Sequence, residues 1–267
     1  MPRIKKKLPV LALVVLAVLT AGLVYGAITS VQPTDSDAVA AAQREEMAKW
    51  HKEKASIVPI DERVLEVPAK NRLDVKRPTD RKLRVALYGD SLAYGMYASK
   101  ESLSYRPLLE KRLAAGGPLD FRAFFFKGAR IEDMIVTADP APGVDLSIME
   151  LGLNDGFRET SPADFQANYR KYLAAIKKAS PDGKILCLGL WSEDRDDYRP
   201  YESAIKLSCA EAGGQYANLN RIYFLGSTTG PAGRETWVGE SDDNHPNDKG
   251  HRMIADFIMA HVPKLRG

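Results

Sequence analysis

From residue 83 onward, short apolar runs alternate with longer stretches in which apolar side chains recur every three or four positions. Short, nearly continuous apolar runs are typical of strands buried on both faces, and their alternation with helices indicates a parallel sheet. The sequence therefore predicts an α/β fold with helices on both faces of the sheet. The expected strands are residues 83–88, 121–126, 144–151, 184–190 and, from a weaker pattern, 215–219.

Two helices carry clear boundary signals. Ser161 can cap the first of them, Pro162 suits its first turn, and the Pro-Asp-Gly sequence at 181–183 ends it. Its apolar positions follow helical spacing between these limits. A last helix is expected over residues 247–262, with one apolar face.

The N-terminus carries a different pattern. Residues 8–30 are uncharged and rich in Leu, Val and Ala, and Arg3 and Lys5–Lys7 precede them. At ~1.5 Å per residue this run can cross a hydrocarbon core of about 30 Å. Positive charge before the run predicts a single-pass anchor with a cytoplasmic N-terminus and an extracytoplasmic remainder. A cleaved signal peptide and a secreted protein are the alternative.

Between the anchor and the globular part lies a stretch interrupted by Pro59, Pro68 and Pro78, a spacing that favours an extended tether. The predicted organisation is a basic tip and anchor at 1–30, an extracytoplasmic spacer at 31–82, and one domain at 83–267. In the alternative reading, residues 57–67 pack on the domain as an arm.

Composition excludes several classes of protein. The chain has 267 residues, is 45% hydrophobic and 27% charged, and is therefore neither low-complexity nor wholly disordered. Its net charge of +3 comes from the basic N-terminal tip, so no basic surface predicts a nucleic-acid partner. Cys187 and Cys209 cannot form a disulfide framework or a cysteine zinc site. They suit either one disulfide or two buried thiols.

Candidate chemistry gathers where the predicted strands end. Gly89-Asp90-Ser91-Leu92 follows the first strand, Lys127-Gly128-Ala129-Arg130 follows the second, and Gly152-Leu153-Asn154-Asp155 follows the third. Ligands of parallel sheets bind beyond the carboxyl ends of the strands. Far downstream, Asp242-Asp243-Asn244-His245 precedes the last helix.

These residue types match nucleophilic catalysis. A serine hydroxyl needs a base within hydrogen-bond reach, and an imidazole suits that task when an acceptor fixes its tautomer. Ser91, His245 and Asp242 fit these roles. Asp243 is an alternative orienting carboxylate and His251 an alternative base. The main-chain N–H groups of Ser91 and Gly128 and the amide of Asn154 are candidate donors to an oxyanion.

In this order the four blocks resemble those of SGNH (GDSL-type) esterases and lipases, over residues 83–262. The resemblance implies a flavodoxin-like three-layer α/β/α fold, a Ser91 nucleophile, an Asp242–His245 pair on one loop, and an oxyanion hole from Ser91, Gly128 and Asn154. It implies neither a metal nor a cofactor. The nucleophile elbow of α/β-hydrolases is excluded, because Ala93 stands where that motif needs glycine.

The expected substrates are esters. Exported enzymes of this type often act on envelope polysaccharides, so removal or transfer of small O-acyl groups on cell-envelope carbohydrate is the leading expectation. The alternatives are a lipase or lysophospholipase acting on lipid esters, and a non-catalytic envelope-binding module. Trp191 and Trp237 fall where the rim of the cleft is expected, and either contact with a sugar or acyl chain or ordinary packing suits them.

Overall fold

The computed structural model describes residues 65–193 and 196–265, and all structural statements concern these residues. A five-stranded sheet in the order β2-β1-β3-β4-β5 forms the centre, and every neighbouring pair is parallel. This is the flavodoxin-like strand order. The strands are β1 (Leu83–Gly89), β2 (Leu119–Phe125), β3 (Leu146–Glu150), β4 (Lys184–Leu188) and β5 (Gln215–Ala217). All five predicted strands are confirmed, with ends shifted by a few residues.

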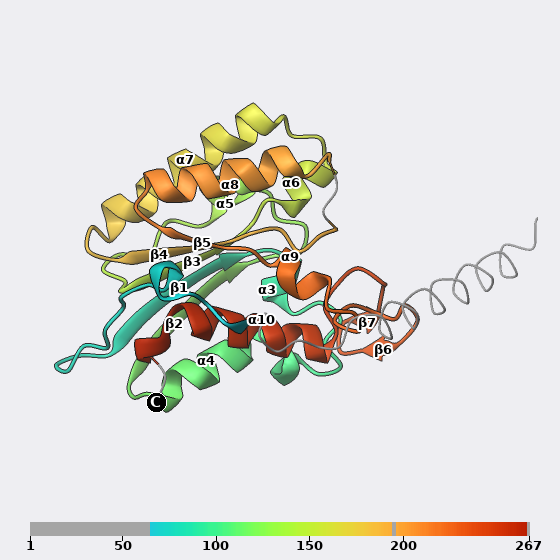
Figure 1. Ribbon diagram of the computed structural model, residues 1–267, viewed down its shortest axis with the longest axis horizontal. Coiled ribbons are helices and arrows are strands. Elements are labelled where there is room, and N and C mark those ends of the chain that lie inside the picture. The colour runs from blue at the N-terminus through green and yellow to red at the C-terminus, as the bar shows by residue number, and fades with distance from the viewer. Residues whose placement is uncertain (1–64, 194–195, 266–267) are drawn as a thin grey trace, which may run out of the picture. The chain divides into compact units, whose positions relative to one another are not determined.

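Helices cover both faces of the sheet (Figure 1). On one face α4 and α10 pack on side chains such as Leu87 and Ile148, and on the other α5, α7 and α8 pack on side chains such as Tyr88 and Met149. The helices are α3 (Ser91–Tyr94), α4 (Tyr105–Ala115), α5 (Ile131–Thr137), α6 (Leu153–Phe157), α7 (Pro162–Ala179), α8 (Arg199–Glu211), α9 (Asn220–Tyr223) and α10 (Asp248–His261). Short 3-10 turns span Ala69–Asn71, Glu101–Leu103 and Pro263–Leu265, and a two-stranded hairpin pairs β6 (Glu235–Thr236) with β7 (Gly239–Glu240).

The two helices with boundary signals form as predicted. Ser161 Oγ accepts a hydrogen bond from Asp164 N at 3.1 Å and begins α7. Asn247 Oδ1 accepts from Lys249 N at 3.0 Å and begins α10. These caps satisfy N–H groups that a helix leaves without partners.

Residues 65–82, the described part of the predicted spacer, pack on the domain. Val67 and Val75 are buried in the core beneath α10. Leu73 N donates to His261 O at 2.8 Å, and Arg77 Nη1 donates to Pro118 O at 3.0 Å. Residues 31–64 lie outside the described part. So does the predicted anchor at 8–30, and among the described residues no helix has the length and hydropathy to cross a membrane.

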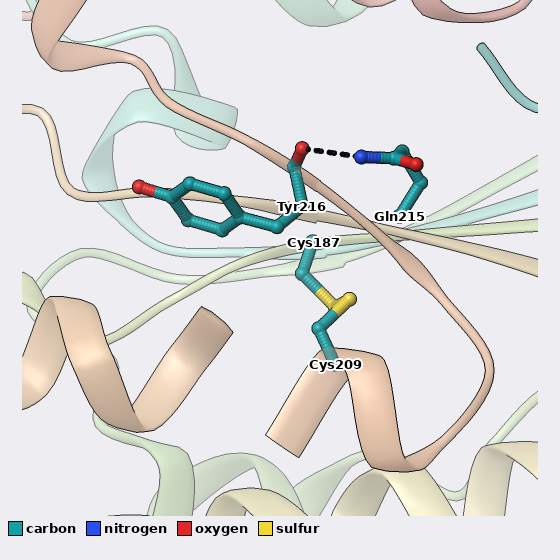
Figure 2. Close-up of a disulfide and its surroundings, with 4 residues drawn as sticks. All are labelled: Cys187, Cys209, Gln215 and Tyr216. Carbon is teal, nitrogen blue, oxygen red and sulfur yellow. Dashed lines mark hydrogen bonds between the residues drawn. A yellow bond between two sulfur atoms is a disulfide. The ribbon is translucent and has the colours of Figure 1, made fainter. Parts of the chain in front are cut away.

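Cys187 of β4 and Cys209 of α8 form a disulfide beneath the sheet (Figure 2). Both side chains are fully buried, and the bond closes a loop across a sequence separation of 22 residues. Of the two alternatives that the sequence left open, the structure therefore has the disulfide. It fixes α8 to the sheet beside β5.

Candidate active site

Ser91 lies at the carboxyl end of strand β1, between β2 and β3 in the sheet, where the chain turns directly into α3. Asp90 caps this helix, since its Oδ1 accepts from Leu92 N at 3.0 Å. The turn is tight: a Cβ at Gly89 would lie 2.5 Å from Ala93 Cβ, so only glycine fits between strand and helix. The Ser91 side chain is thereby held at the sheet edge with 8% of its surface exposed.

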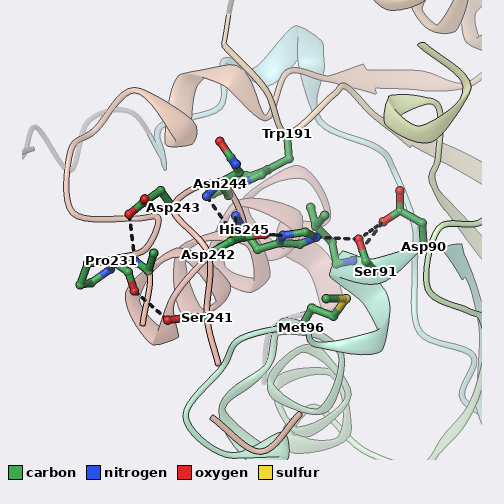
Figure 3. A network of polar contacts seen from close by, with 12 residues as sticks. Asp90, Ser91, Met96, Trp191, Pro231, Ser241, Asp242, Asp243, Asn244 and His245 are labelled. Atoms are coloured by element: carbon green, nitrogen blue, oxygen red, sulfur yellow. Dashed lines mark hydrogen bonds and ion pairs between the residues drawn. The ribbon is translucent and has the colours of Figure 1, made fainter. Parts of the chain in front are cut away.

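His245 comes from the loop between the β6–β7 hairpin and α10. Its Nε2 lies 3.0 Å from Ser91 Oγ across a sequence separation of 154 residues. Its Nδ1 lies 2.7 Å from Asp242 Oδ2. Figure 3 shows the three side chains in one line of hydrogen bonds. The structure therefore brings together the three residues that the sequence nominated.

Asp242 is held by its own loop. Its Oδ1 accepts from His245 N at 2.8 Å and from Asn244 N at 2.9 Å. Burial raises the pKa of Asp242, but the hydrogen bond and charge of His245 outweigh burial and leave that pKa below its usual value. An ionised carboxylate only accepts hydrogen bonds, so Nδ1 carries the imidazole proton and Nε2 is free to accept from Ser91.

The two alternatives for this pair lie elsewhere. Asp243 Oδ1 accepts from Ala232 N at 2.8 Å. His251 is fully buried in α10, with its Nδ1 3.3 Å from Tyr105 N and its Nε2 3.0 Å from Met96 O. Burial lowers the pKa of His251 to about 4. Both groups therefore have structural partners and neither contacts Ser91.

Aromatic side chains support the His245 loop. Trp191 is 3% exposed and donates from Nε1 to Asn244 O at 2.9 Å, so of the two alternatives that the sequence left open the structure has ordinary packing. Trp237 stacks on Tyr94 at 5.4 Å between ring centroids. Tyr97 places its ring edge-on to His245 at 5.1 Å, a contact that the sequence did not suggest.

Asn154 and Gly128 lie beside Ser91. Asn154 Nδ2 donates to Asp90 Oδ2 at 2.8 Å and to Ala129 O at 3.2 Å, which ties together the residues adjoining Ser91 and Gly128. Gly128 adopts φ +71°, a conformation that favours glycine. The three candidate oxyanion donors thus belong to one connected cluster.

Two further carboxyl groups of this cluster are buried. Asp155 Oδ2 accepts from Ile131 N at 3.1 Å, and burial raises the pKa of Asp155 to about 7. Glu150, the last residue of β3, accepts from Asp90 N at 3.2 Å. Sequence reasoning assigned Glu150 no role, although a charged residue at the end of a buried strand was the available signal.

Replacement of Asn154 by Ala is expected to lower kcat on an acetyl ester by roughly 10²- to 10³-fold, because an oxyanion donor acts mainly in the transition state. KM should change little. Steady-state kinetics with a chromogenic acetyl ester measure both constants. Asn168→Ala on α7 is the matched control and should keep wild-type kinetics. A kcat within twofold of wild type in Asn154→Ala would contradict an oxyanion role, about 0.4 kcal/mol being too little for such a donor.

The parallel sheet, with a hydrogen-bonded Ser–His–Asp chain at its carboxyl edge, has the architecture of a serine hydrolase. The chain belongs to the GDSL-like lipase/acylhydrolase family, whose sequence profile matches residues 87–253, more than half of its length. It is an SGNH-type esterase or acylhydrolase, as the four blocks predicted. No sequence among the curated proteins matches the chain.

Several solved structures share the fold. The acetylxylan esterase Axe2 from Geobacillus stearothermophilus matches with a TM-score of 0.53 and 16% identity, over 71% of this chain and 96% of that one. The acetyl xylan esterase AlAXEase matches with a TM-score of 0.52 and 19% identity, over 67% and 99%. The salicylyl-acyltransferase SsfX3 from a tetracycline biosynthetic pathway matches with a TM-score of 0.53 and 18% identity, over 69% and 55%.

Proposed function

We propose that this protein is a membrane-anchored, extracytoplasmic serine esterase that removes or transfers small O-acyl groups on cell-envelope carbohydrate. The observation that carries the proposal is the continuous chain from Ser91 Oγ through His245 to Asp242, in a member of this family. Ser91 is the nucleophile, His245 the general base and Asp242 the residue that orients the imidazole.

Acylation follows from this geometry. Ser91 Oγ bonds to the ester carbonyl carbon while its proton passes to His245 Nε2, and the carbonyl electron pair moves onto oxygen. The N–H groups of Ser91 and Gly128 and the amide of Asn154 stabilise that oxyanion. The electron pair then returns, the bond to the alcohol oxygen breaks, and this oxygen takes the proton from Nε2. An acyl-enzyme and a free alcohol result.

Deacylation repeats these steps with a second hydroxyl. His245 takes a proton from water or from an acceptor alcohol as its oxygen bonds to the acyl carbon. Collapse of the intermediate returns the proton to Ser91 Oγ. Water gives hydrolysis and a sugar hydroxyl gives transfer, so the same residues serve both reactions.

A cavity beside the His245–Asp242 pair has hydroxyl and charged side chains in its lining, which supports a hydroxylated substrate. It has a volume of about 320 Å³. In acylation His245 gives its proton to the departing alcohol, so a cavity on its side suits the alcohol portion of the ester. The hydroxyl and charged groups of its lining can hydrogen-bond the hydroxyl groups of a sugar. Besides His245 and Asp242, its lining includes Tyr97, Ser99, Arg234, Thr236, Ser241 and Lys249.

The disulfide and the N-terminal sequence support the location. Disulfides persist mainly in oxidising compartments outside the cytosol, and Cys187 and Cys209 are paired. The apolar run at 8–30, preceded by positive charge, is long enough to anchor the protein with its domain outside. Secretion after signal cleavage is the alternative.

The proposal is tested with the full-length chain on acetylated xylo-oligosaccharide and on chromogenic esters of increasing acyl length. We expect Ser91-dependent release of acetate and a kcat/KM that falls with acyl length. A preference for long acyl chains would contradict the proposal and support a lipase that acts on lipid esters. Glycan binding without turnover, and without fluorophosphonate labelling of Ser91, would replace it with the binding module.

Hydrolysis and transfer are separated in the same assay. A second, unacetylated oligosaccharide is added and the products are identified by mass spectrometry. Acetate alone indicates hydrolysis, and an acetylated acceptor indicates transfer.

A further inference from the structure

A second carboxyl group lies directly behind the candidate nucleophile. Glu150, at the carboxyl end of β3, is 5% exposed, and Asp90, which precedes Ser91, is fully buried. Glu150 Oε2 accepts from Asp90 N at 3.2 Å and from Tyr105 Oη at 3.4 Å. The two carboxyl groups are therefore buried neighbours, with Glu150 bonded to the main chain of Asp90. The triad reactions use neither of them.

Two buried carboxyl groups this close together favour holding one proton, because a protonated carboxyl group can donate a hydrogen bond whereas a carboxylate can only accept. Among the described residues, no Lys or Arg side chain forms an ion pair with either group. Two negative charges in contact and away from water are strongly unfavourable. The other titratable groups around the pair are Ser91, Tyr105, Tyr169, His245 and, behind Tyr105, His251.

The contacts favour Glu150 as the group that holds the proton, because both donors that bond to it reach one oxygen, Oε2. Asp90 accepts from Leu92 N at 3.0 Å and from Asn154 Nδ2 at 2.8 Å, so both of its oxygens face donors. Burial raises the pKa of Glu150 well above its usual value and that of Asp90 to about 6. The proton therefore resides on Glu150, and Asp90 is the carboxylate near neutral pH.

We propose that Glu150 is a positioning residue of the oxyanion hole: its protonated carboxyl group donates a hydrogen bond to Asp90, and the Asp90 carboxylate holds the Asn154 amide beside Ser91. The inference rests on the role proposed for Asn154. It assigns the buried acid at the end of β3 a function as a neutral hydrogen-bond donor.

Glu150→Gln and Glu150→Leu test the donor role. A glutamine amide keeps the shape of the protonated acid and can donate to Asp90, whereas leucine cannot donate. We expect Glu150→Gln to keep kcat on a chromogenic acetyl ester within about threefold of wild type. We expect Glu150→Leu to lower kcat by about 10- to 100-fold with KM within about twofold, because a misplaced oxyanion donor weakens mainly the transition state.

The matched controls are Glu110→Gln and Glu110→Leu at an exposed site on α4, which should leave both constants unchanged. Equal loss of kcat in Glu150→Gln and Glu150→Leu would overturn the proposal. So would wild-type kinetics in a folded Glu150→Leu variant, or an increase in KM alone.

Infrared spectroscopy tests the protonation state, even if Glu150→Leu fails to fold. The difference spectrum of wild type minus Glu150→Gln near neutral pH should contain the carbonyl stretch of a protonated carboxyl group. A carboxylate band in its place would overturn the proposal. These measurements need only a simple acetyl ester, so failure on acetylated carbohydrate would refute the proposed substrate and leave the Glu150 result standing.

Discussion

Replacement of Ser91 by Ala is expected to abolish esterase turnover, with kcat reduced on the order of 10⁴-fold or more. The variant keeps the imidazole and the oxyanion donors but has no oxygen that can form an acyl-enzyme. Initial rates on a chromogenic acetyl ester measure the loss. Mass spectrometry after fluorophosphonate treatment should find the label on Ser91 in wild type and no label at position 91 in the variant.

Ser208→Ala is the matched control for that experiment. Ser208 is a buried serine of α8, a helix that does not carry any of the three triad residues. Its replacement should preserve both turnover and labelling of Ser91. Undiminished turnover in Ser91→Ala would refute the proposed mechanism. Equal losses in the two variants would point to damage to the fold.

Replacement of Asp242 by Asn should lower kcat by roughly 10²- to 10⁴-fold while the fold is retained. An asparagine amide can donate to His245 Nδ1 and so stabilise the tautomer with its proton on Nε2. That tautomer cannot accept the proton of Ser91 Oγ. The loss of the carboxylate also leaves the imidazolium formed during the reaction without its compensating charge.

The adjacent Asp243→Asn is an unusually close control, because it makes the same chemical change one residue away. Asparagine keeps an oxygen that can accept from Ala232 N, the bond that Asp243 makes. Its kcat should therefore stay within about twofold of wild type, as for a change outside the reacting groups. A larger loss of kcat in Asp243→Asn than in Asp242→Asn would mean that Asp243, and not Asp242, orients the imidazole of His245.

Local sequence was sufficient for the elements and for the location of the candidate site. The apolar run that becomes β1 ends at Gly89, and the capping oxygen of Asp90 starts a helix at once, so Ser91 had to lie at the sheet edge. The cap at Ser161 likewise determined where α7 begins. Such signals act over a few residues and can be read without knowing the fold.

Other features depended on contacts between distant segments. The sequence left a rim role and ordinary packing open for Trp191, and the structure packs it in the core with its indole N–H bonded to Asn244 O. For the segment before the domain the sequence left open a tether over 31–82 or an arm over 57–67, and in the structure Val67 and Val75 pack in the core. Scattered valines show no periodicity that could have decided between the two.

By itself, the sequence determined the order of strands and helices, the position of Ser91 at a strand end, and the pairing of an acidic loop with His245. Only the tertiary structure decided that Asp242 faces the imidazole while Asp243 faces Ala232, that Cys187 and Cys209 are joined, and that Glu150 is buried against the main chain of Asp90. The physical reason is range: caps and periodicity are set by neighbours in sequence, whereas these choices depend on which side chains meet when α8, α10 and the strands pack around one core.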